Sequence, residues 1–222
     1  MKYFRELVNS WVIPPPGGWK CHCGVELDFP GVCDACAEER RTEEAVARIS
    51  SEVATIPVRF RWATFDDPEL RQRCKTDLRK ARKALQDLFD RKIQNLVLLG
   101  AAGAGKSSLA CAMLQSALYE EVVFSGRFCA AVTLAACRTD SGLGTIPPAL
   151  YDAMCASLIV LDDVGQEPER NAPVITELMQ HRYNDGKPTI VTTWLSPAEV
   201  AQRYSAGTAR RFFEHSAIVR LS

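Results

Sequence analysis

Residues 96–108 have the types and spacing that point most directly to chemistry. They read Leu-Val-Leu-Leu-Gly-Ala-Ala-Gly-Ala-Gly-Lys-Ser-Ser, so four apolar residues run into the pattern Gly-x-x-x-x-Gly-Lys-Ser. A helix-favouring segment follows over residues 109–119. A buried strand, a glycine turn and a helix N-terminus in this order form a phosphate-binding loop, because backbone N–H groups and the helix dipole both favour an anion there. The stretch predicts a nucleoside triphosphate site.

Two side chains of this loop have the chemistry that a triphosphate requires. We expect Lys106 to contact the β- and γ-phosphates and Ser107 to bind Mg²⁺. The alternative is a glycine-rich turn without a ligand, but such a turn needs neither the lysine nor the serine. The residues expected to bind the triphosphate are Gly100, Gly103, Ala104, Gly105, Lys106, Ser107 and Ser108.

Two adjacent acids end a second apolar run, since residues 158–165 read Leu-Ile-Val-Leu-Asp-Asp-Val-Gly. In open α/β folds, ligands bind at the carboxyl ends of the parallel strands. We expect Asp162 to hold Mg²⁺ through its water shell and Asp163 to orient or deprotonate an attacking water. Either acid alone is also compatible with a turn, but the pair at a strand end supports hydrolysis.

Four of the nine cysteines form a cluster near the N-terminus, as Cys21-His22-Cys23 and Cys33-Asp-Ala-Cys36. Four thiolates in a segment too short for its own core predict a structural Zn²⁺ site. The first pair is C-x-C rather than C-x-x-C, which leaves open that His22 replaces one cysteine. Two disulfides or free thiols are the alternative, which the inferred cytoplasmic location disfavours.

Length and composition limit the classes of protein to consider. With 222 residues, 47% hydrophobic and 24% charged, the chain is long enough for one α/β domain and a small appendage. Its 27 basic and 27 acidic residues cancel, so net charge gives no argument for nucleic acid. No secretory signal and no run of about 18 apolar residues occurs. The odd number of cysteines and the nucleotide loop favour a cytoplasmic protein without a membrane partner.

Apolar runs and helical spacing alternate along the chain, which predicts an α/β fold with a five-stranded parallel sheet and helices on both faces. The expected strands are residues 96–99, 127–134, 158–161, 189–193 and 217–221. The expected helices are residues 34–53, 68–90, 109–119, 149–156 and 172–184. A further helix begins at Ser196, where Glu199 completes a capping box.

Two other segments carry a resemblance to a known group. Residues 57–66 read Pro-Val-Arg-Phe-Arg-Trp-Ala-Thr-Phe-Asp. Residues 161–167 read Leu-Asp-Asp-Val-Gly-Gln-Glu, so the two acids are followed by Gly-Gln-Glu after one valine. Both resemble bacterial replicative helicase loaders of the DnaC/DnaI type and the related IstB-type transposition ATPases, within the AAA+ superfamily. The resemblance covers residues 56–221. It implies an AAA+ P-loop ATPase domain over 56–222, without a C-terminal lid domain, preceded by a zinc-binding module and linker helix over 1–55.

The resemblance also implies roles for individual residues. Residues 57–66, with Phe65 among them, would lie beside the base of ATP. Thr193 would sense the γ-phosphate, at a point where relatives usually continue with Asn and this chain has Trp194. Arg211 matches the arginine that relatives insert into a neighbour's site, and Arg210 is the close alternative.

The function that the resemblance implies is that of an ATP-dependent helicase loader. It would bind the replicative DNA helicase, form an oligomer, and hydrolyse ATP weakly until assembled, because an arginine supplied in trans contributes roughly 10³–10⁵ in rate. The basic helix at residues 71–83 is a candidate contact for single-stranded DNA, although a solvated face is the commoner explanation. Two alternatives remain: an IstB-type regulator of a transposase, and an adaptor that binds ATP without hydrolysing it.

Overall fold

The computed structural model describes residues 18–74, 76–138 and 145–222. The chain separates into two compact units, Met1–Arg48 and Ile49–Ser222. The first holds a short antiparallel pair, β1 (Trp19–Lys20) and β2 (Glu26–Leu27), and the start of helix α2 (Asp34–Val53). Helix α2 begins and ends as the sequence predicts. Among the described residues up to 48, Cys21 is the one buried hydrophobic residue, so this unit has almost no apolar core.

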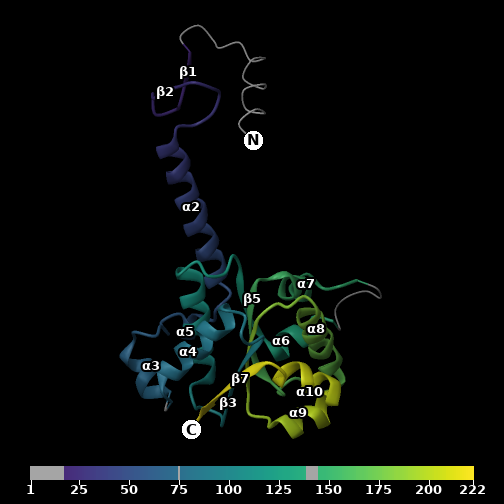
Figure 1. Cartoon of the computed structure of the whole chain (residues 1–222). Helices are drawn as coiled ribbons and strands as arrows, with labels where there is room; N and C mark the ends of the chain where they lie inside the picture. The colour runs from purple at the N-terminus through teal and green to yellow at the C-terminus, as the bar shows by residue number, and fades with distance from the viewer. Residues whose placement is uncertain (1–17, 75, 139–144) are drawn as a thin grey trace. The chain divides into compact units, whose positions relative to one another are not determined.

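The second unit is built on a five-stranded sheet in the order β4-β5-β6-β3-β7 (Figure 1). All neighbouring strands are parallel, which confirms the predicted sheet. The strands are β3 (Asn95–Gly100), β4 (Gly126–Ala130), β5 (Leu158–Val164), β6 (Thr189–Thr193) and β7 (Ser216–Leu221).

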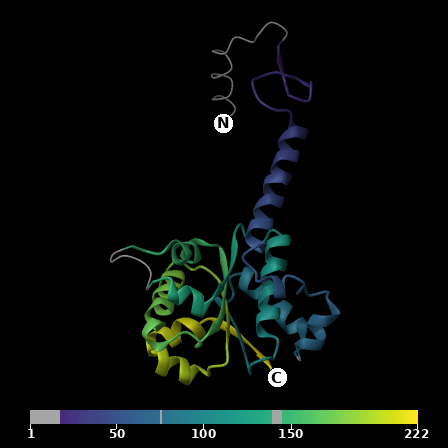
Figure 2. The same cartoon turned by 180° about the vertical axis from the view of Figure 1, so that it is seen from behind.

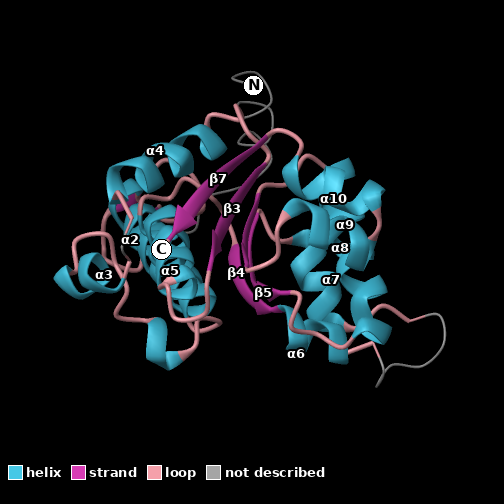
Figure 3. Cartoon of the chain, turned by 90° about the horizontal axis from the view of Figure 1, so that it is seen from below, coloured by secondary structure: helices cyan, strands magenta, loops and turns pink. Residues whose placement is uncertain are grey.

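Successive residues of the central strands belong to two different cores. Leu96 and Leu98 pack in one cluster with Ile190, whereas Val97 packs in a second cluster with Val191. This alternation follows from the two-residue period of a strand, so a strand that is apolar on both faces needs helices on both. Seen along the sheet from below, helices cover each face (Figure 3).

The helices divide between these two faces, and the view from behind shows the same two groups (Figure 2). One face carries α3 (Pro68–Arg73), α4 (Leu78–Phe89) and α5 (Lys106–Tyr119), with the short 3₁₀ turn η1 (Val58–Phe60) against α5. The other carries α6 (Ala131–Ala136), α7 (Pro148–Cys155), α8 (Ala172–Asn184), α9 (Pro197–Tyr204) and α10 (Ala206–Phe213), with a second 3₁₀ turn, η2 (Glu169–Asn171), preceding α8. No helix in the described ranges is long and apolar enough to cross a membrane.

The long helix expected over residues 68–90 is wrong, because the chain breaks it into α3 and α4. Cys74 is extended, with a ψ angle of 98°, and its thiol donates to the carbonyl oxygen of Gly105 at 3.3 Å. Asp77 then restarts the helix by accepting the backbone N–H of Arg79 at 3.0 Å. A contact with the phosphate loop, distant in sequence, and a local N-cap together outweigh the helical periodicity.

The strand expected over residues 127–134 is also too long, since β4 ends at Ala130 and α6 follows at once. The buried residues of α6 are Ala131, Leu134 and Ala135, which is helical spacing. The apolar run therefore satisfies two patterns, and the helical one wins where alanine is frequent.

One buried cation joins α8 to its neighbours and predicts a large effect on stability. The guanidinium of Arg182 donates to the carbonyl oxygens of Ala153 and Ala156 at 2.8 Å each and of Pro188 at 2.6 Å, and to the hydroxyl of Thr189 at 3.0 Å. Burial lowers the pKa of Arg182 to about 10. Replacing Arg182 with Met leaves these acceptors without a hydrogen-bond donor, and each buried acceptor left unpaired costs about 1–3 kcal/mol.

We expect Arg182→Met to lower the free energy of unfolding, measured in urea, by about 3–5 kcal/mol. The control is Arg79→Met, because Arg79 is exposed on α4 and its change is expected to stay within about 0.5 kcal/mol. Equal effects of the two substitutions would contradict the structural role of Arg182.

Candidate active site

The phosphate loop joins β3 to α5 and needs glycine at three positions. Gly103 and Gly105 have φ angles of +79° and +85°, in the left-handed region that favours glycine. A Cβ on Gly100 would lie 2.4 Å from the carbonyl oxygen of Leu221, so a side chain there would clash with the backbone of β7. The strand, the turn and the helix N-terminus thus have the arrangement that the sequence predicts.

Lys106 places the main positive charge at this loop. Its ammonium donates to the carbonyl oxygens of Gly100 at 2.9 Å and of Ala101 at 2.8 Å, and only 5% of the residue is exposed. The charge is therefore held at the loop backbone, where N–H groups and the start of α5 also favour an anion.

Asp162 lies beside Ser107 at the end of β5, as a metal pair requires. Its carboxylate accepts the hydroxyl of Thr192 at 2.7 Å. Burial raises the pKa of Asp162 above its usual range, and hydrogen bonds from Thr192 and Ser107 oppose that rise. A carboxylate next to a serine hydroxyl is a suitable donor set for Mg²⁺, so the residues present fit the predicted ion.

A bulge in β5 aims Asp163 into the loop region. The register between β5 and β6 shifts between Leu161 and Val164, and Asp163 has a φ angle of +56°. The backbone N–H of Asp163 donates to the hydroxyl of Thr192 at 2.8 Å, which fixes this left-handed conformation. Strained residues at bulges are typical of functional sites, where they redirect a side chain.

A cavity of about 350 Å³ brings most of these residues together. From the sequence prediction it contains Gly103, Gly105, Lys106, Ser107, Ser108 and Asp163. It is also lined by Arg59, Phe60, Arg73, Ala102, Gln166 and Trp194. Arg59 and Phe60 belong to residues 57–66, which the resemblance implied would lie beside ATP. Arg73 and Gln166 were not expected at the cavity, because no local pattern relates them to the loop.

Phe65 lies elsewhere. It is 6% exposed, with the guanidinium of Arg82 over its ring at 4.7 Å from the centroid, and it lines a separate cavity between α3 and α4. The structure does not bring Phe65 into the lining of the loop cavity.

The two threonines that end β6 have different roles. The hydroxyl of Thr193 donates to the carbonyl oxygen of Val164 at 2.7 Å and accepts the N–H of Leu195 at 3.0 Å. Both of its hydrogen-bonding functions are thus engaged by the backbone, and Thr192 instead contacts the acidic pair. Strand alternation could have separated them, since neighbours point to opposite faces. Trp194, 43% exposed, faces the cavity.

Arg211 lies at the opposite end of the sheet from the phosphate loop. The side-chain amide of Asn95, the first residue of β3, donates to the backbone oxygen of Arg211 at 2.6 Å. The loop begins at Gly100, and five residues of strand span about 16 Å. Arg210 is exposed and forms an ion pair with Glu214 at 3.2 Å. This placement suits an arginine that serves another copy of the chain.

A buried carboxylate anchors the turn that follows Asp163. Glu167 accepts the backbone N–H of Gly165 at 3.1 Å and the Nε of Arg203 at 3.2 Å, and Tyr204 also donates to it. Its side chain is fully buried. The turn after β5 is therefore tied to α9, a role that the Gly-Gln-Glu motif alone did not reveal.

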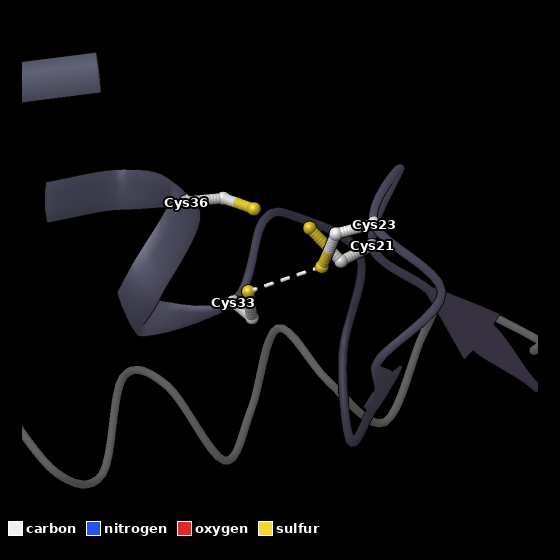
Figure 4. A group of neighbouring side chains, drawn as sticks. All are labelled: Cys21, Cys23, Cys33 and Cys36. Atoms are coloured by element: carbon white, nitrogen blue, oxygen red, sulfur yellow. Dashed lines mark hydrogen bonds between the residues drawn. The ribbon is translucent and has the colours of Figure 1, made fainter. Parts of the chain in front are cut away.

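The four predicted zinc ligands form a second site in the first unit (Figure 4). The Sγ atoms of Cys21, Cys23, Cys33 and Cys36 all lie within 4.8 Å of one another and point inward. A tetrahedral Zn²⁺ with Zn–S bonds of about 2.3 Å needs sulfurs about 3.8 Å apart, and Cys23 and Cys33 are at 3.5 Å. Backbone N–H groups of Cys23 and Cys33 lower the pKa of Cys21 to about 6, so a thiolate is available. His22 is outside this group of four.

These observations define the class of protein. The fold is a five-stranded parallel sheet with helices on both faces, and it carries a phosphate loop and two acids at the carboxyl ends of its strands. A four-cysteine cluster lies near the N-terminus. The chain belongs to the family of IstB-like ATP binding proteins, whose profile matches residues 26–209. No curated protein matches the sequence.

Solved structures share the fold at low sequence identity. The DnaC helicase loader is 20% identical with a TM-score of 0.61, and the match covers 75% of this chain and 100% of that one. DnaI is 20% identical with a TM-score of 0.54, over 72% and 93% of the two chains. AMPPCP-bound DnaA from Aquifex aeolicus is 19% identical with a TM-score of 0.56, over 75% and 51%. These likenesses show that the chain shares its fold with the DnaC and DnaI helicase loaders, as the resemblance implies.

Proposed function

We propose that this protein is an ATP-hydrolysing helicase loader, which binds a replicative DNA helicase in the cytoplasm and helps place it on single-stranded DNA. The observation that carries the proposal is the similarity to the DnaC helicase loader, which extends over that chain's whole length. Membership of an ATP-binding family and the residues of the loop cavity support the ATP-dependent part.

The chemistry would be hydrolysis by positioning and charge neutralisation. Asp163 would orient a water and accept its proton while the water oxygen bonds to the γ-phosphorus. The bond from that phosphorus to the β,γ-bridging oxygen breaks, and its electron pair stays with ADP. Lys106 would stabilise the phosphate charge. Mg²⁺, held through Ser107 and Asp162, would supply further positive charge when bound.

Assembly would complete the site. Arg211 lies near the first residue of β3, and its own phosphate loop follows the last residue of that strand. We therefore propose that Arg211 reaches the triphosphate of a neighbouring subunit. Hydrolysis would then be slow in the monomer and faster in a homo-oligomer or a helicase-bound ring. The residue at the interface would be Arg211 rather than Arg210, since Arg210 is paired with Glu214.

The cysteine unit would hold Zn²⁺ and contact the helicase. Its four sulfurs fit a structural zinc, and its helix α2 has no buried residue, which leaves polar surface for a partner. Regulation of a transposase is the second candidate function, favoured by the name of the matching family. A non-hydrolysing adaptor is the third, favoured by Trp194 and by the engaged hydroxyl of Thr193.

Binding to the host's replicative helicase tests the proposal. Both proteins are purified and run on size-exclusion chromatography with light scattering, with ATP, with ADP and without nucleotide. The expected result is a complex of defined mass whose stability depends on ATP. Absence of a complex in all three conditions contradicts loading, and an ATP-dependent complex with a transposase would support the second function instead.

A further inference from the structure

Arg59 is a cation of the loop cavity that the functions assigned so far do not use. It belongs to η1, which packs against α5, and it lines the cavity together with Lys106, Ser107 and Asp163. Arg59 lines the cavity at this chain's own loop, whereas Arg211 lies at the opposite end of β3.

The guanidinium N–H groups of Arg59 donate no hydrogen bond to other described groups of the protein. Its guanidinium lies over the ring of Phe60, 4.5 Å from the centroid, and no carboxylate forms an ion pair with it in the described part of the chain. A cation–π contact uses the face of the guanidinium and leaves its N–H edge for an acceptor. By contrast, Arg61 donates to backbone oxygens at 2.9 Å, and Arg73 forms an ion pair with Glu69.

The cavity lining places Arg59 with the residues expected at the metal and the water, since Arg59, Ser107 and Asp163 line the same cavity. The ring of Phe60 packs on the ring of Phe128 in β4, with 6.4 Å between their centroids. Strand β4 lies next to β5, which carries the two acids.

We propose that Arg59 binds the terminal phosphate of ATP in cis, donating hydrogen bonds to γ-phosphate oxygens. This inference rests on the proposed ATPase function. As the water oxygen bonds to the γ-phosphorus and the bond to the β,γ-bridging oxygen breaks, charge spreads over the oxygens that Arg59 contacts. Arg59 would thus give the unassembled chain a basal activity, to which the neighbour's Arg211 adds.

The test compares affinities for ATP and ADP, since ADP lacks the phosphate that Arg59 would contact. Isothermal titration measures both dissociation constants for the wild type, Arg59→Ala and Arg59→Lys, together with single-turnover hydrolysis. For Arg59→Ala we expect about a 10- to 150-fold rise in the Kd for ATP, the worth of hydrogen bonds to a charged group, with less than about a twofold change for ADP. Arg59→Lys keeps the positive charge, so its Kd for ATP is expected to lie between those of the wild type and Arg59→Ala.

The control is Arg79→Ala, an exposed arginine on α4 that lies outside the loop cavity, for which neither affinity should change. Equal losses for ATP and ADP, or no loss for either, would overturn the inference. If the wild type itself binds no ATP, the proposed function fails instead. If the melting temperature of Arg59→Ala is well below that of the wild type, Arg59→Gln replaces it, because glutamine keeps most of the aliphatic part of the side chain. The ratio of the dissociation constants for ATP and ADP is then compared in the same way.

Discussion

Replacing Lys106 with Ala is expected to weaken ATP binding by at least about a hundredfold and to leave no measurable hydrolysis. Lys106 is 5% exposed and its ammonium donates to the carbonyl oxygens of Gly100 and Ala101, so its charge is little screened by water. Among the residues that the structure describes, no other lysine lines the loop cavity. Fluorescence titration with a labelled ATP and a phosphate-release assay measure the two effects.

Lys80→Ala is the matched control, because Lys80 is exposed on α4 and lies outside that cavity. Its affinity for ATP is expected to equal that of the wild type. The melting temperature of Lys106→Ala shows whether the loop still folds. A folded Lys106→Ala protein that binds ATP normally would contradict the nucleotide site described above.

Removal of zinc is expected to unfold the first unit and to leave the second intact. Among the described residues up to 48, only Cys21 is a buried hydrophobic residue, so apolar burial contributes little there. Zinc binding to such small modules is worth about 10–16 kcal/mol, which exceeds any other stabilising term available to this segment. Hydrogen exchange of the β1–β2 pair should become fast in the presence of a chelator, while β3 and α5 keep their protection.

Cys33→Ser and Cys155→Ser form the matched pair for this prediction. Cys33 contributes one of the four clustered sulfurs, whereas Cys155 is exposed at the end of α7 and outside the cluster. Elemental analysis should find one zinc per chain in the wild type and in Cys155→Ser, and much less in Cys33→Ser. Equal zinc content in all three proteins would show that the cysteines are not the ligands.

The parts of the fold that the sequence predicts are those with strong local patterns. Strand β3, the phosphate loop and α5 follow from apolar residues, glycines and a helical segment in direct succession. The start of α9 is confirmed in detail, since Ser196 accepts the N–H of Glu199 and the Glu199 carboxylate accepts the N–H of Ser196. Residues within a few positions of one another decide each of these features.

The features that could not be predicted depend on contacts between distant segments. The break between α3 and α4 depends on the contact of Cys74 with Gly105, 31 residues away in sequence. The resemblance implied that residues 57–66 lie beside ATP, but the packing of η1 on α5 that brings Arg59 to the loop cavity follows from no periodicity. Asp163 has its left-handed conformation at a bulge in β5, and a bulge has no signature in this strand.

The claim at the centre of this account is a nucleotide site completed by a neighbouring subunit, and a mixing experiment tests it most directly. Asp163→Asn keeps Arg211 but should not hydrolyse ATP, and Arg211→Ala keeps the acids but lacks the residue for its neighbour. Each variant alone, with the helicase present, is expected to show little ATPase activity. When the two are mixed in equal amounts, activity should rise well above the sum of the separate samples, because an Arg211 from one variant meets intact acids of the other. Activity that stays at that sum would contradict the shared site.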